Sequence, residues 1–225
     1  MNFLSHYYFD SRNHDDNMVI GVVLPDFIKN AEKDCNLYPL KTPELFKPFS
    51  IQSAILSGWE RHVRVDQLFH TSTFFSTQSH ALKLLILPAC EGSPVKPFFL
   101  AHIGLELLLD HLLITHNLVN INRFYEQLEN ADKNAIDSFL KNAGMTNTDL
   151  FFRFLNNFIS SRYLLSYQKI ENISYALQQI CKRIWADPFT EDQIGMLNAQ
   201  LEVFRQQIEH DYLSIFEDIQ NTIGG

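Results

Sequence analysis

The segment from Pro97 to His116 constrains the fold most, because it is strongly apolar yet carries ionisable residues at a fixed spacing. His102, Glu106 and Asp110 are four residues apart, and residues four apart lie on one face of an α-helix. An isolated buried charge is costly, so such a stripe must be paired, solvated or bound to a metal. The segment therefore predicts a helix that carries a polar stripe within apolar surroundings.

A second stripe with the same spacing, His62, Asp66 and His70, lies on a predicted helix from Ser50 to about Phe69. Two such helices packed face to face would direct imidazole nitrogens and carboxylate oxygens into one shared cavity. This mixed set suits Mn²⁺, Fe²⁺ or Zn²⁺ better than Ca²⁺, which prefers oxygen ligands. A lone His and Asp at this spacing more often form a surface pair or a satisfied core pair, but two stripes favour a metal site.

The rest of the chain also predicts helices, with no alternating strand pattern and no internal repeat. Met18 to Lys29 reads as a short helix, and Pro25 inside it allows a start near Leu24 instead. Residues 30–49 contain Pro39, Pro43 and Pro48 and are predicted to form a loop with little regular structure. Further helices are predicted over 73–87, 97–116, 120–142, 147–165, 168–185 and in a long final segment to about residue 219. The sequence thus predicts an all-α fold, a compact single-domain helical bundle over residues 1–225.

Composition excludes several classes of protein. The 225 residues are 46% hydrophobic, enough for a core without disulfides. The net charge of −8 and the lack of a Lys/Arg cluster argue against nucleic-acid binding. Three widely spaced cysteines do not form a disulfide framework. We see no signal peptide and no apolar run near the roughly 20 residues that span a bilayer, so we expect a cytoplasmic protein.

Five short motifs, in the same order along nearly the whole chain, resemble those of acyl carrier protein phosphodiesterases. They are Asn2–His6 (family "NFLAH"), Ile20–Lys29 ("GNLLADFVKG"), His62–Asp66 ("HRxID"), Glu106–His116 ("DxxxDHFLxRH") and Tyr163–Tyr167 ("WLxxY"). The resemblance implies a fold distantly like HD-type phosphohydrolases and a divalent metal, often manganese. It also implies hydrolysis of the phosphodiester that joins 4′-phosphopantetheine to a serine of holo acyl carrier protein.

The resemblance and the two stripes together give the predicted site. The predicted metal ligands are His6, Asp26, His62, Asp66, His70, His102, Glu106 and Asp110. Asp26, Arg64 and His111 are predicted to act in catalysis. Asp26 or else Glu106 orients or deprotonates a water, Arg64 or else Lys29 offsets charge on phosphate, and His111 protonates the leaving oxygen or supports a ligand. Basic residues for an acidic carrier protein are Arg61, Arg64, Lys29, Lys33, Lys41 and Lys47.

The chain departs from the family pattern at several positions. His70 stands where an Asp is expected, His102 where the family has a small residue, Ser72 where some members have His, and Asn117 replaces a Trp. Two alternatives follow, a hydrolase of another small phosphoester and a catalytically inactive helical binding module. A di-iron oxygen-dependent enzyme ranks last, because its Glu-x-x-His pairs are not repeated on two helices here.

Overall fold

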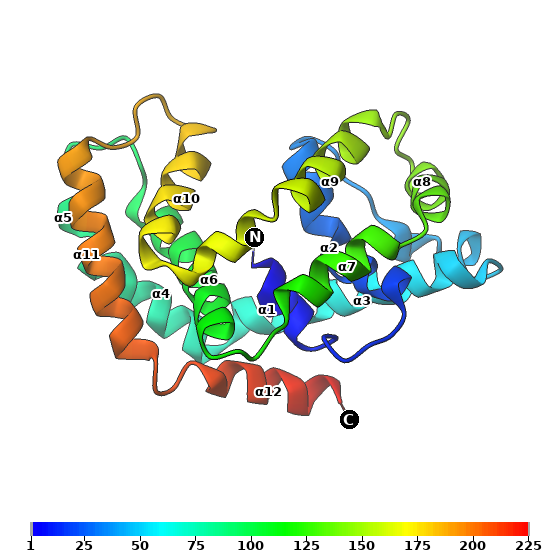
Figure 1. Cartoon of the computed structure of the whole chain (residues 1–225), viewed down its shortest axis with the longest axis horizontal. Helices are drawn as coiled ribbons and strands as arrows, with labels where there is room; N and C mark the ends of the chain where they lie inside the picture. The colour runs from blue at the N-terminus through cyan, green and yellow to red at the C-terminus, as the bar shows by residue number, and fades with distance from the viewer. Residues whose placement is uncertain (1, 225) are drawn as a thin grey trace. The chain divides into compact units, whose positions relative to one another are not determined.

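The computed structural model describes residues 2–224, and its regular secondary structure is helical. No strand occurs within these residues, so the predicted all-α class is confirmed. Three 3₁₀ helices cover Pro39–Lys41, Pro43–Leu45 and Tyr163–Gln168. The α-helices are α1 (Phe3–Tyr8), α2 (Asp16–Ala31), α3 (Ser50–Thr71), α4 (Thr73–Leu85), α5 (Leu87–Cys90), α6 (Pro97–Thr115), α7 (Ile121–Asn130), α8 (Lys133–Asn142), α9 (Asp149–Ser161), α10 (Ile170–Lys182), α11 (Glu191–Ile208) and α12 (Leu213–Ile223) (Figure 1).

The helices group into two compact units. Unit 1 contains the residues up to Ser5, Gln67–Leu118 and the chain from Leu165 onward, and unit 2 contains His6–Asp66 and Val119–Leu164. The chain passes from one unit to the other within α1 and within α3, so neither unit is one continuous stretch of sequence. The single domain over residues 1–225 and the likeness to HD-type phosphohydrolases stay predictions.

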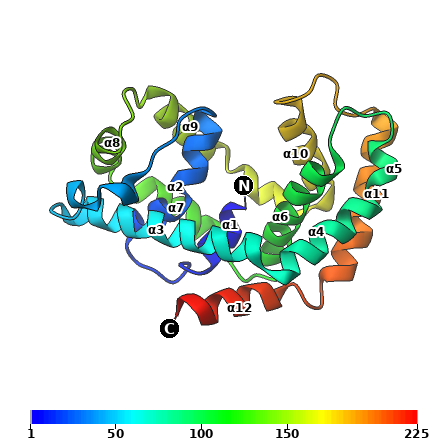
Figure 2. The same ribbon diagram turned by 180° about the vertical axis from the view of Figure 1, so that it is seen from behind.

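Helix α6 forms the core of unit 1. Apart from its stripe of ionisable residues it is apolar on all sides, and it is almost entirely buried, the pattern of a helix that is covered all round. Helices α4, α10 and α11 pack against it, and Figure 2 shows α4 beside α6 from behind. Among the described residues α6 alone has the length and hydropathy to cross a membrane, but 78% of its apolar window is buried within the protein. Such burial is typical of a core helix.

In unit 2, helices α2 and α3 cross at two glycines. A Cβ on Gly58 would lie 2.8 Å from the Cα of Gly21 and would collide with the carbonyl of Met18. A Cβ on Gly21 would likewise collide with the carbonyl of Ile55. The two backbones therefore touch, and this contact sets the position of the neighbouring residues of α3 relative to α2. Helices α7 and α9 cover the other side of α2.

The start predicted near Leu24 is wrong, because α2 runs without a break from Asp16 through Pro25. The side chain of Asp15 accepts hydrogen bonds from the N–H groups of Asn17 and Met18 and so caps the helix at its N-terminus. Pro25 costs α2 one internal hydrogen bond. Burial of the apolar residues on both sides of Pro25 holds the helix together in spite of that loss.

Other predicted helices are divided by local signals. The segment 120–142 forms α7 and α8, because the side chain of Asp132 caps a new helix by accepting from the N–H groups of Asn134 and Ala135. The long final segment forms α11 and α12, with residues 209–212 between them. The short α5 contains Pro88 in its first turn, a position that proline tolerates.

The crossing at the glycines gives a stability prediction. Gly58→Ala should lower the free energy of unfolding by about 1–3 kcal/mol, because the added methyl must push two helix backbones apart. Gly195→Ala in α11 is the matched control, since its Cβ meets nothing within 4 Å. There alanine should be neutral or stabilise the protein by up to about 1 kcal/mol. Urea denaturation of both variants tests this, and equal stabilities would contradict the crossing.

Candidate metal centres

The two predicted stripes lie on helices as expected, but their side chains fall into two groups of potential metal ligands. His6, His62 and Asp66 form the first, called here the His6 group, within unit 2. His70, His102 and Glu106 form the second, the His70 group, within unit 1. In each group one ligand atom from each residue lies within 4.8 Å of the others. Among the described residues, Asp66 is therefore grouped with His6 from α1, and Glu106 with His70 from α3.

The His6 group is nearly closed to solvent. The rings of His6 and His62 stack at a centroid distance of 4.0 Å and an interplanar angle of 20°. Their exposed fractions are only 1% and 6%, whereas Asp66 is half-buried. The group therefore offers two sheltered imidazoles and one carboxylate that solvent can reach.

The main chain of α2 fixes the orientation of His62. Its Nδ1 lies 2.8 Å from the carbonyl oxygen of Val22. A carbonyl can only accept, so Nδ1 carries the hydrogen and donates it, which leaves the Nε2 lone pair available. A histidine held in this way by a backbone carbonyl is a common arrangement for a metal ligand. The glycine crossing described above brings Val22 to this position, and sequence reasoning missed it because any residue carries a carbonyl.

The His70 group is more open. Oε1 of Glu106 lies 3.3 Å from Nε2 of His102 and 3.7 Å from Nε2 of His70. The two rings stack at 4.8 Å with an interplanar angle of 16°, and Phe75 packs edge-on against both. The histidine side chains are 30% and 45% exposed, while Glu106 is buried.

Asp110 belongs to neither group. It is completely buried, and its carboxylate accepts hydrogen bonds from the backbone N–H of Leu4 at 3.1 Å and from the N–H and Oγ of Ser5, both at 2.7 Å. Burial raises the pKa of Asp110 to about 7, against the opposite effect of these hydrogen bonds. The carboxylate thus caps the first turn of α1, the helix that carries His6.

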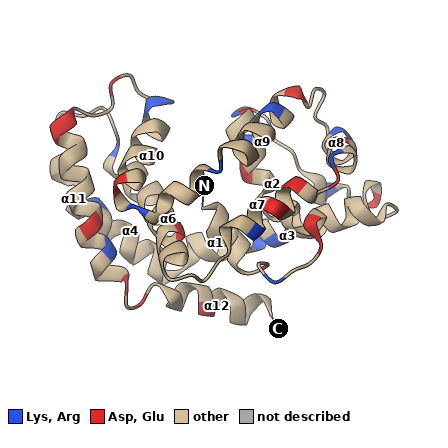
Figure 3. Cartoon of the chain, in the orientation of Figure 1, with Lys and Arg blue, Asp and Glu red and all other residues tan. Residues whose placement is uncertain are grey.

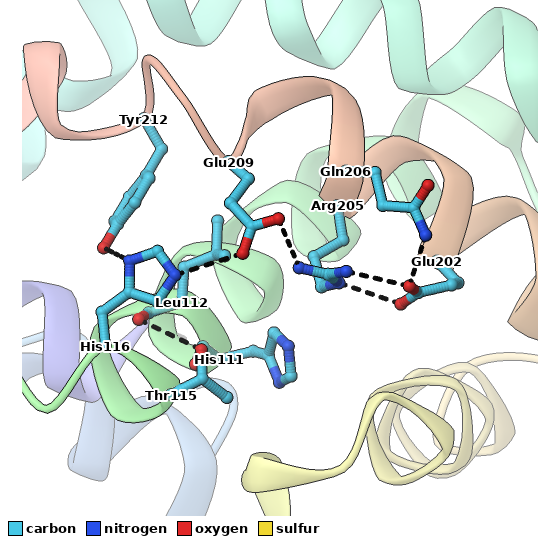
Figure 4. A network of polar contacts seen from close by, with 9 residues as sticks. All are labelled: His111, Leu112, Thr115, His116, Glu202, Arg205, Gln206, Glu209 and Tyr212. Atoms are coloured by element: carbon cyan, nitrogen blue, oxygen red, sulfur yellow. Dashed lines mark hydrogen bonds and ion pairs between the residues drawn. The ribbon is translucent and has the colours of Figure 1, made fainter.

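His111 also lies apart from both groups. Its Nδ1 donates to the carbonyl of Tyr167 at 2.7 Å, and burial lowers the pKa of the imidazole. It lines a polar cavity of about 470 Å³ within unit 1. Arg205 also lines this cavity and forms ion pairs with Glu202 and Glu209, with a nitrogen-to-oxygen distance of 2.9 Å in each (Figure 4).

The other two predicted catalytic residues are also outside the two groups. Asp26 is half-buried on α2, one helical turn beyond Val22, and Arg64 is exposed on α3. The neighbouring Arg61, predicted only as part of a basic patch, forms an ion pair at 3.5 Å with the buried Asp10.

The chemistry of each group fits a divalent cation. Two imidazoles and one carboxylate form a mixed nitrogen and oxygen set, which suits Mn²⁺, Fe²⁺ or Zn²⁺. Three protein ligands also leave coordination positions for water or substrate, as in catalytic metal sites.

The family model described as acyl carrier protein phosphodiesterase matches residues 1–219 of the 225. The chain belongs to this family. No curated protein and no solved structure matched it. The family is that of a phosphodiesterase, so the two groups of histidines and carboxylates occur in a chain related to hydrolases.

Two of the departures from the phosphodiesterase pattern have structural reasons. Ser72 caps α4, because its Oγ accepts from the N–H of Phe75 at 3.0 Å. Asn117 has a left-handed backbone with φ of 57°, which asparagine tolerates well. It ends α6 in a Schellman motif, where the N–H of Leu118 bonds to the carbonyl of Leu113. Both residues serve helix ends in this chain.

The position of Asp110 gives a prediction that separates two roles. If the carboxylate caps α1, Asp110→Ala should lower the free energy of unfolding of the metal-free protein by about 2–4 kcal/mol, because buried N–H groups lose their acceptor. Asp218→Ala, an exposed aspartate on α12, should change it by less than about 0.5 kcal/mol. A metal-free Asp110→Ala protein as stable as the wild type would instead favour the predicted ligand role.

Proposed function

We propose that this chain hydrolyses the phosphodiester that joins 4′-phosphopantetheine to a serine of holo acyl carrier protein, using a divalent metal in the His6 group. The family membership supports the reaction and the substrate. The observation that carries the metal proposal is the pairing of His6, His62 and Asp66, with His62 held in the ligand tautomer by Val22.

His6, His62 and Asp66 would hold the metal ion. A bound divalent ion, Mn²⁺ in this proposal, would lower the pKa of a coordinated water and polarise a phosphoryl oxygen. His62 and His6 keep their rings in place through the carbonyl of Val22 and through stacking. Asp66, the half-buried member of the group, would neutralise part of the charge of the ion.

The remaining roles follow from residue type and from the family motifs. We assign to Asp26 the orientation or deprotonation of the attacking water, since a carboxylate suits a general base. Arg64, exposed and cationic, offsets negative charge on the phosphate. The role of His111, protonation of the leaving oxygen or support of a ligand, stays a prediction, and as an acid the ring would need a proton on Nε2 because Nδ1 donates to Tyr167.

The carrier protein would meet the basic residues of unit 2. Acyl carrier proteins are acidic, and complementary charge speeds the encounter of two proteins. The six basic residues of the predicted patch all belong to unit 2, although the total charge is −8. Figure 3 shows lysine and arginine in blue along the ribbon. The reducing cytoplasm remains the expected location, and Cys35, Cys90 and Cys181 are free thiols.

Mass spectrometry of holo acyl carrier protein tests the activity directly. Incubation with the wild-type protein and Mn²⁺ should remove the mass of phosphopantetheine, and a chelator should stop the reaction. His62→Ala and Asp66→Ala should each slow it by about 100-fold or more, because the metal loses a direct ligand. His80→Ala is the control, since His80 is exposed on α4 and outside both groups, and it should react like the wild type.

The outcomes distinguish the alternatives. If the carrier protein stays intact but a small phosphodiester is cleaved in the presence of Mn²⁺, the substrate is another phosphoester. Metal binding without either reaction would identify a catalytically inactive binding module. Equal rates for the wild type and both ligand variants would overturn the assignment of the His6 group.

A further inference from the structure

We propose that His70, His102 and Glu106 form a second divalent-metal site, selective for Zn²⁺-like ions and loaded independently of the His6 group. This inference does not rest on the proposed hydrolysis, because it concerns other side chains in the other unit. The ion would connect the last turn of α3 to the core helix α6, since His70 lies on α3 and the other two ligands lie on α6.

The distances within the group match those between ligands of one ion. Zinc binds nitrogen and oxygen at about 2.0–2.2 Å, so neighbouring ligand atoms of a tetrahedral site are about 3.4 Å apart. The two nitrogen-to-oxygen separations here are 3.3 Å and 3.7 Å. The stacked rings must turn slightly so that both lone pairs point to one ion. The protein therefore already places three donors close to the geometry that the ion requires.

The carboxylate is placed to bind the same ion. Glu106 is buried at 4% exposure in the most apolar helix of the chain, so little of its carboxylate is exposed to competing solvent. The two Nε2 atoms converge on the same carboxylate oxygen from rings that stack on each other. In the proposed site a single divalent ion would contact both nitrogens and this carboxylate oxygen.

The surroundings suit a site that exchanges its ion with solvent. Both histidines are partly exposed, so an ion and its water ligands can reach the nitrogens without unfolding. Phe75 packs edge-on against the rings of His70 and His102, at centroid distances of 4.8 Å and 5.1 Å, and restricts their movement. The two imidazoles favour Zn²⁺ or Co²⁺ over Mg²⁺ and Ca²⁺, which prefer oxygen ligands.

The experiment uses Zn²⁺ and Co²⁺ with the full chain. Elemental analysis after Zn²⁺ loading and desalting, together with the visible absorption of the Co²⁺ protein, counts and characterises the sites. The wild type should hold one ion more than His102→Ala and one more than His70→Ala, and the Co²⁺ absorption of this site should vanish in both variants. His80→Ala should match the wild type. Zn²⁺ should raise the melting temperature of the wild type by a few degrees more than that of His102→Ala.

His62→Ala separates this proposal from the proposed function. Loss of an ion in His62→Ala but not in His70→Ala or His102→Ala would overturn the second site and leave the His6 group standing. Loss in His70→Ala and His102→Ala but not in His62→Ala would support the second site and contradict the first. Circular dichroism of the metal-free variants checks folding, and Glu106→Gln, which keeps the side-chain volume, should reproduce the loss of the ion.

Discussion

The cost of placing polar groups on the buried helix α6 governs the arrangement of unit 1. Three polar residues of this helix, Glu106, Asp110 and His111, are buried, and each has a different partner. Glu106 meets two imidazoles, Asp110 accepts from the first turn of α1, and His111 donates to a backbone carbonyl. Because a buried polar group without a partner is costly, these partners fix which elements can cover α6. These three residues of one helix thus contribute to a candidate metal site, a helix cap and a cavity wall.

In unit 2, close packing of backbones has the corresponding effect. Gly21 and Gly58 allow α2 and α3 to touch, and the contact brings the carbonyl of Val22 to Nδ1 of His62. A side chain at either glycine would move the helices apart and release the histidine from its hydrogen bond. The orientation of a candidate metal ligand therefore depends on two residues that have no chemistry of their own. Metal centres generally depend on hydrogen bonds from neighbouring groups that hold the ligands in the correct orientation.

The departures from the family pattern divide into two kinds. Ser72 and Asn117 stand at helix ends, where their hydrogen bonds and backbone conformation explain them. His70 and His102 instead add nitrogen donors beside Glu106, the first residue of the motif Glu106–His116. The first kind changes how helices end and leaves both ligand groups intact. The second kind changes the donor chemistry of the His70 group, and nitrogen donors alter the preference for a metal.

The sequence by itself determined the helical class, most helix positions and the residues that share a face, because hydrogen bonding within a helix fixes neighbours three and four residues apart. His62 with Asp66, and His102 with Glu106, are therefore correct pairs. The breaks between helices at Asp132 and at 209–212 were not predicted. The helical spacing of apolar residues continues across both breaks, and local caps and packing end the helices there. Only the tertiary structure decided that His6 joins His62 and that Asp110 caps α1, since contacts between distant segments depend on how helices pack and no spacing in the sequence encodes them.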